Sequence, residues 1–98
     1  MRPLGTDLDR DDVRPYFLWD EDVTVGELRA RLQGGDARER DRLLGKMLRE
    51  ARDIDVFRFV SPGEVADALP RVERRLGRRA AFWRFLIEGW RDDGLLPR

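Results

Sequence analysis

The chain has 98 residues, of which 20 are basic and 20 acidic, and it contains no histidine and no cysteine. Without an imidazole or a thiol, histidine acid–base catalysis, a cysteine nucleophile, a Cys/His zinc site and a thiolate-bound iron–sulfur cluster are all excluded. The length fits one small domain, and no apolar run approaches the ~20 residues that span a bilayer, so we expect a cytoplasmic protein without a membrane partner.

The N-terminal part of the chain divides into a leader and an aromatic segment. Residues 1–14 predict a flexible acidic leader, because proline, glycine and alternating charge leave few apolar side chains to bury. Residues 15–20 read PYFLWD, an aromatic string that is too short for a helix of its own. We expect it to be extended, with its rings laid on the domain and the acidic run at 20–22 turning the chain toward the first helix.

Two capping signals predict the first two helices. Thr24 and Glu27 have the spacing of a capping box, and apolar residues at helical spacing follow, so a short amphipathic helix is predicted over residues 25–33. A glycine pair ends it. Asp36 and Glu39 repeat the capping signal, and the next 16 residues carry an apolar face. This stretch predicts a second, longer helix.

A third start signal precedes the C-terminal half. Ser61, followed by a proline, and Glu64 mark the beginning of a helix. Because Pro70 lacks an N–H group and its ring clashes with the carbonyl four residues back, we expect this helix to end or kink at Leu69, with a further turn to Leu76 and Gly77. Residues 54–60 predict a helical turn, with a strand as the lesser option.

The last helix is predicted over residues 78–92, closed by Gly94, and it is apolar around most of its circumference. Such a helix either lies at the centre of its domain or is half covered by something else. A central core helix is the simpler interpretation. In the alternative, Trp83 or Trp90 lies in an exposed patch that binds a partner. The sequence alone does not separate the two.

These elements predict an all-α fold, a compact bundle of four to five short helices with an extended aromatic N-terminal segment. Residues 15–94 form the single helical domain, and residues 95–98 form a C-terminal tail. Acidic clusters are the remaining candidates for catalysis, since two aspartates can hold Mg²⁺. Acidic pairs beside helices are more often caps and solvated turns, so we expect no enzymatic activity, no metal site and no cofactor.

The balanced charge conceals a dipolar arrangement. Residues 7–22 contain seven acidic side chains and two arginines, whereas residues 71–84 contain six arginines and one glutamate. The basic segment has the charge to contact phosphates, although a neutral chain with a pI of about 6.3 is atypical of a DNA-binding module. The nucleic-acid-binding candidates are Arg71, Arg74, Arg75, Arg78 and Arg79.

The strings PYFLWDEDV, ALPRVERRL and AAFWRFLIEGW resemble a set of short bacterial proteins. These proteins share a Tyr/Phe-Phe-x-Trp-Asp opening and a Phe-Trp pair in the last helix, here Phe82 and Trp83, and the resemblance covers about residues 15–90. Proteins similar to these are often encoded beside a nucleotidyltransferase-like toxin of the abortive-infection type. The resemblance thus implies an antitoxin or accessory role. The local charge of residues 7–22 suggests how such a role would work, with the acidic side chains occupying a basic cleft of the toxin. In the alternative, Asp20 only caps or turns the chain and the leader only increases solubility.

We therefore predict a non-enzymatic interaction protein, the antitoxin-like partner of a nucleotidyltransferase-type toxin. The alternative is a small DNA-binding or autoregulatory domain that uses the basic segment from Arg71 to Arg84. The residues predicted to bind the protein partner are aromatic or acidic: Tyr16, Phe17, Trp19, Asp20, Glu21, Asp22, Trp83 and Trp90.

Overall fold

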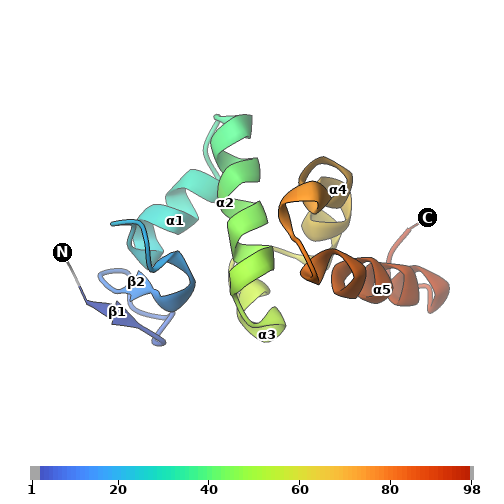
Figure 1. Ribbon diagram of the computed structural model, residues 1–98, viewed down its shortest axis with the longest axis horizontal. Coiled ribbons are helices and arrows are strands. Elements are labelled where there is room, and N and C mark those ends of the chain that lie inside the picture. The colour runs from blue at the N-terminus through green and yellow to red at the C-terminus, as the bar shows by residue number, and fades with distance from the viewer. Residues whose placement is uncertain (1–2, 98) are drawn as a thin grey trace.

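A computed structural model describes residues 3–97 of the chain (Figure 1). Within them the fold is mostly helical, as predicted, with five α-helices and only one pair of two-residue strands. The helices are α1 (Val25–Leu32), α2 (Ala37–Glu50), α3 (Asp53–Val56), α4 (Pro62–Val72) and α5 (Arg79–Asp92). The shorter elements are the strands β1 (Leu4–Gly5) and β2 (Arg14–Pro15) and the 3-10 turns η1 (Tyr16–Leu18) and η2 (Glu73–Arg75).

Helix α2 stands at the centre of the molecule. The N-terminal elements and α1 lie on one side of it, and α4 and α5 lie on the other (Figure 1). Its apolar side chains Leu43, Met47 and Leu48 are fully buried, and α2 contacts α1, α3, α4, α5 and both 3-10 turns. The interpretation of the last helix as the centre is therefore wrong, because α5 buries only one side and leaves Phe82 and Phe85 exposed.

The capping signals predict the helix starts correctly. The hydroxyls of Thr24 and Ser61 accept hydrogen bonds from the backbone N–H of Glu27 and Glu64. The carboxylates of both glutamates accept in turn from the backbone N–H of the cap residue. Asp36 likewise accepts from the third backbone N–H of α2. These bonds depend only on residues three positions apart, which is why the sequence is sufficient to locate them.

The expectation that the helix ends at Leu69 is wrong. Helix α4 runs on to Val72 and then tightens into η2. Pro70 lies in the last turn of α4, where its missing N–H removes a single hydrogen bond near an end that carries unsatisfied carbonyls in any case. Pro70 therefore does not shorten the helix, and it lies just before the point where α4 passes into η2.

The leader packs on the domain instead of extending freely, which corrects the expectation for residues 1–14. Leu8 and Val13 are buried, and β1 pairs in parallel with β2 to close the loop between them. The carbonyl of Val13 accepts from the N–H of Val25 at 2.8 Å, at the start of α1. Two buried apolar side chains and the backbone hydrogen bonds to α1 together hold the loop on the domain. Residues 1 and 2 lie outside the described part of the chain.

The expectation of an extended aromatic segment is wrong beyond Pro15: Pro15 is extended, but Tyr16–Leu18 form the single turn η1 and Trp19 is also helical. This turn buries Phe17 and Leu18 in the core. Trp19 follows at its end and is 59% exposed, so it is not laid on the domain with the other rings. The tight turn sends neighbouring side chains in different directions, whereas a straight strand allows alternate rings to share one face.

Helix α5 caps the C-terminal end of α2. The indole Nε1–H of Trp83 donates to the carbonyl of Leu48 at 2.8 Å, and Arg79, one turn earlier, donates to the carbonyl of Ala51 at 3.1 Å. No glycine ends α2, so its last carbonyls receive donors from another helix. The cation of Arg79 also lies where the dipole of α2 is negative.

We expect Trp83→Phe to lower the free energy of unfolding by about 2–3 kcal/mol, because it leaves the buried carbonyl of Leu48 without its donor and opens a small cavity. Urea denaturation at neutral pH measures the loss. Trp90→Phe is the matched control, because Trp90 is only half-buried. Its expected loss is below about 1 kcal/mol, and equal losses in the two variants contradict a capping role for Trp83.

Candidate functional site

The structure separates the eight residues predicted to bind a partner. Phe17 and Trp83 are buried, so they belong to the core and present no surface. Trp90 is half-buried, with its ring centre 5.6 Å from that of Phe57. The other five predicted residues lie close together in the chain, between β2 and α1 (Figure 1). The predicted residues on α5 and those between β2 and α1 therefore do not form one site.

Tyr16 holds the junction between α2 and α3. Its hydroxyl donates to the carboxylate of Asp55 at 2.5 Å and accepts from the backbone N–H of Arg52 at 2.9 Å. Burial and the bond to Asp55 together raise the pKa of Tyr16. A neutral phenol that both donates and accepts satisfies two groups at once, so Tyr16 has a structural role.

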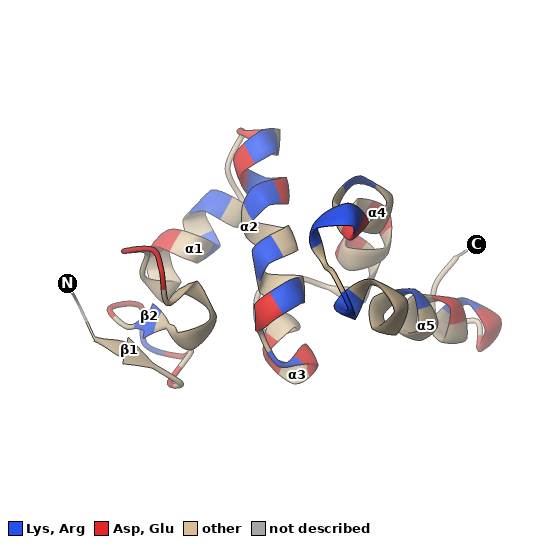
Figure 2. Cartoon of the chain, in the orientation of Figure 1, with Lys and Arg blue, Asp and Glu red and all other residues tan. Residues whose placement is uncertain are grey.

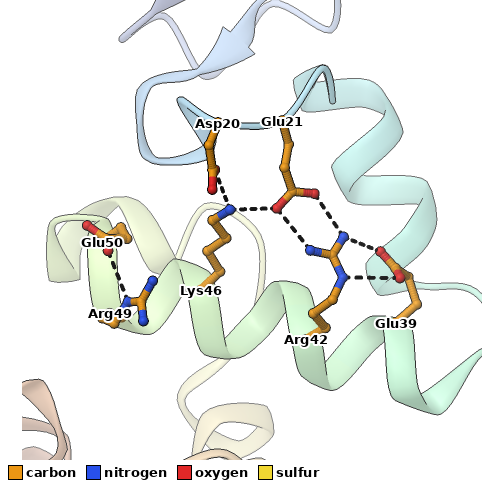
Figure 3. Close-up of polar contacts among 7 residues, drawn as sticks. All are labelled: Asp20, Glu21, Glu39, Arg42, Lys46, Arg49 and Glu50. Carbon is orange, nitrogen blue, oxygen red and sulfur yellow. Dashed lines mark hydrogen bonds and ion pairs between the residues drawn. The ribbon is translucent and has the colours of Figure 1, made fainter. Parts of the chain in front are cut away.

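An ion-pair cluster joins the acidic run after η1 to α2 (Figure 3). Both oxygens of Glu21 accept from Arg42, at 2.9 Å each, and one of them also accepts from Lys46 at 2.7 Å. Lys46 donates to Asp20 as well, and Arg42 donates to Glu39 at 2.6 Å. The cluster fastens residues 20 and 21 to the exposed side of α2.

Glu21 is the centre of this cluster. Its side chain is only 19% exposed, and the hydrogen bonds from Arg42, with help from Lys46, lower its pKa to about 2 despite the opposing effect of burial. Burial alone lowers the pKa of Lys46, but its bonds to Asp20 and Glu21 outweigh burial and raise it. All members of the cluster are therefore charged at neutral pH.

The acidic segment is largely neutralised by cations of the same chain. Besides Asp20 and Glu21, Asp9 pairs with Arg58 at 2.7 Å and Asp12 pairs with Arg10 at 2.7 Å. At least four of the seven acidic side chains predicted to fill a basic cleft thus have partners within the fold. Figure 2 shows acidic residues in the N-terminal loops and both basic and acidic residues along α2.

Trp19 is the aromatic side chain of this region that is most exposed to solvent. It lies between the buried Leu18 and the paired Asp20, and a backbone bond from the N–H of Glu21 to the carbonyl of Leu18, at 3.1 Å, closes the turn around it. Both sides of Trp19 are therefore fixed while its indole stays exposed. The sequence identified the segment, but nothing in it indicated which of the rings faces outward.

Some arginines of the basic segment bind other residues of the chain, and the others are exposed. Arg71 pairs with Asp41 at 3.0 Å, and Arg79 caps α2. Arg74, Arg75 and Arg78 are exposed. Two of the five predicted nucleic-acid-binding residues, Arg71 and Arg79, therefore already have partners within the chain.

A shallow groove of about 250 Å³ lies between α2 and η2. Basic side chains and one glycine line it: Arg42, Gly45, Lys46, Arg49 and Arg75. Figure 3 shows Arg42 and Lys46 directed toward Glu21 and Asp20, and Arg49 toward Glu50. Most of the positive charge of the groove is thus paired with carboxylates of the chain itself, which weakens its attraction for phosphate.

Helix α5 presents a second apolar surface that the sequence did not single out. Phe85 is 75% exposed and Phe82 is 37% exposed. Both belong to the helix predicted over residues 78–92. Because that helix is apolar around most of its circumference, its sequence does not indicate which face the rest of the fold covers.

Among residues 3–97, no cluster of three or more acidic, histidine or cysteine side chains is placed to hold a metal ion. In the same part of the chain, no helix combines the length and the apolarity needed to cross a membrane. Comparison of the chain with protein-family models, with curated proteins and with solved structures finds no match.

We expect Glu21→Gln to lower the free energy of unfolding by about 1–2 kcal/mol at pH 7. The carboxyl has a pKa of about 2 when folded against an ordinary 4.5, so its stabilisation is complete above about pH 4.5 and is lost as the pH falls through 2. Urea denaturation between pH 7 and 2 therefore gives a shallower pH dependence for Glu21→Gln than for the wild type. Glu50→Gln, at a more exposed pair, is the control. Identical pH dependences in Glu21→Gln and the wild type contradict the assignment.

Proposed function

We propose that this chain is a non-enzymatic interaction protein of the bacterial cytoplasm, which binds a nucleotidyltransferase-type toxin as its antitoxin or accessory partner. Trp19 is the observation that carries the proposal. Its indole is exposed while the backbone on both sides of it is fixed. Tryptophan is among the residues that most often dominate the energy of protein interfaces, and a side chain that is positioned before binding loses less entropy on association.

The resemblance supports the class of partner. The shared opening motif comprises Tyr16, Phe17, Trp19 and Asp20, and in this fold the first two hold the segment together while Asp20 is fastened to Lys46. Trp19 is the member of the motif with a large exposed apolar surface. A motif with three residues that shape a turn and one that faces outward is well suited to present that one residue to a partner.

Electrostatic attraction to the toxin is a secondary part of the proposal. The ion pairs of Asp20 and Glu21 hold the loop, so the attraction is left to the exposed Asp7 and Asp11. Deletion of the leader is a poor test of this attraction, because Leu8 is a core residue. Neutralising both carboxylates in Asp7→Asn/Asp11→Asn preserves the leader and is expected to slow association with a basic cleft mainly at low salt.

The expected effect of Trp19→Ala is at least about tenfold weaker binding to the nucleotidyltransferase-type protein encoded beside this chain, with an unchanged melting temperature. Co-purification and calorimetric titration measure the binding. Leu95→Ala is the matched control, because Leu95 is also exposed and belongs to the segment after α5, which lies at the opposite end of the molecule from the N-terminal elements (Figure 1). Unchanged affinity in Trp19→Ala, or failure of the neighbouring product to bind the wild-type chain, contradicts the proposal.

The DNA-binding alternative is supported by the exposure of Arg74, Arg75 and Arg78. It predicts binding of generic duplex DNA that falls steeply with salt and weakens when all three are changed to alanine. An interaction protein binds no duplex DNA at low salt, so one salt titration distinguishes the two functions.

A further inference from the structure

One side of α5 is covered by the domain and the opposite side is not. Trp83 and Ile87 point into the core. A stripe of residues three or four positions apart runs along the other side of the helix: Arg78, Phe82, Phe85, Gly89 and Asp93. Phe85 is its most exposed member, and a side chain added at Gly89 would meet open space. The stripe is therefore an apolar centre with a basic end and an acidic end.

The charges at the ends of α5 interact unfavourably with the dipole of the helix. Helices α1, α2 and α4 each begin with a capping side chain and an acidic residue in the first turn. Helix α5, all of which is described, follows the N-cap residue Arg78 and has no capping side chain and no acidic residue in its first turn. At its other end Arg91 is the one favourable charge of the last turn, and Asp92 and the C-cap residue Asp93 outnumber it. A positive charge at the N-terminus and a negative charge at the C-terminus of a helix are both unfavourable. A local conflict of this kind points to compensation from outside the helix.

We propose that the exposed stripe of α5 pairs with the same stripe of a second copy of this chain. The two helices lie antiparallel, with the two-fold axis near Phe85. Arg78 of each copy then lies beside Asp93 of the other, and Phe82 packs over the open surface at Gly89. A surface with this arrangement is self-complementary, which is what a two-fold interface requires.

The geometry of Phe82 favours association. The guanidinium carbon of Arg79 lies 4.9 Å from the centre of the Phe82 ring, and the ring of Trp83 is 5.4 Å away, edge to face. Arg79 is itself held by its bond to Ala51. Phe82 is thus ordered in the monomer, and little side-chain freedom is lost when a second copy covers it.

The size of the surface sets the strength of the pairing. One face of a single helix from each copy buries less than the ~1,200 Å² at which standard interfaces begin. The dimer is therefore weak, with a dissociation constant of roughly 10–100 µM. It is independent of the toxin and uses a face of the molecule remote from Trp19.

Sedimentation velocity of the full chain, from low micromolar to high micromolar concentration, tests the proposal. We expect a monomer–dimer equilibrium in the wild type. Phe85→Ser is expected to raise the dissociation constant more than about tenfold, because it removes the apolar centre. Circular dichroism checks that each variant is folded.

A charge exchange tests the antiparallel arrangement. Arg78→Asp and Asp93→Arg alone each place like charges together across the interface, so each is expected to weaken dimerisation at least about fivefold. The double variant Arg78→Asp/Asp93→Arg restores opposite charges and returns the dissociation constant to within about twofold of the wild type. Arg38→Asp, the same change at an exposed position of α2, is the control and leaves dimerisation unchanged.

A wild-type chain that stays monomeric throughout the concentration range overturns the proposal, as does a double variant that dimerises no better than the single variants. If the chain is monomeric alone and Phe85→Ser instead weakens toxin binding, the stripe is a surface for the toxin and self-pairing is wrong. If the chain dimerises as expected but no toxin binds, only the proposed function fails.

Discussion

The C-terminal end of α2 is the point on which the rest of the structure depends. A helix that stops without a glycine leaves backbone groups that need partners from elsewhere, and here they lie close to the core. Trp83 reaches them from α5, and Tyr16 reaches the following junction from η1. These two aromatic residues come from opposite ends of the sequence, so one junction attaches both halves of the molecule to the central helix (Figure 1).

This junction explains why chemically similar rings have different roles. Phe17 is buried next to the exposed Trp19, and Trp83 is buried two residues from the exposed Phe85. In each pair, the buried ring packs in the core or caps a helix there. Two positions further along a 3-10 turn or an α-helix, a side chain points in a different direction, so the second ring of each pair lies at the surface. The proposed binding surfaces thus arise beside the residues that hold the fold together.

Sequence patterns predicted the local features well. Helix starts depend on residues three apart, and the caps at Thr24, Asp36 and Ser61 were all placed correctly. The central helix was misidentified, because the position of a helix in a bundle depends on its neighbours and not on its own apolar content. The packing of the leader depends on a bond between Val13 and Val25 that no local pattern encodes. The motif located the segment around Trp19, but the exposure of its indole depends on tertiary packing of the turn, to which the ion pair of Asp20 with Lys46 contributes and which no local pattern encodes.

The dependence of α2 on Trp83 also sets the order in which the fold is completed as the chain is synthesised. Translation delivers the leader, α1 and the whole of α2 before any residue of α5 exists. Once α3 has also been made, the nascent chain holds Tyr16 and its partners Arg52 and Asp55, yet the carbonyl of Leu48 still lacks its indole donor. Helix α5, the last of the five helices to be synthesised, therefore supplies the cap for the helix at the centre, and the fold of the described residues forms completely only after α5 has emerged.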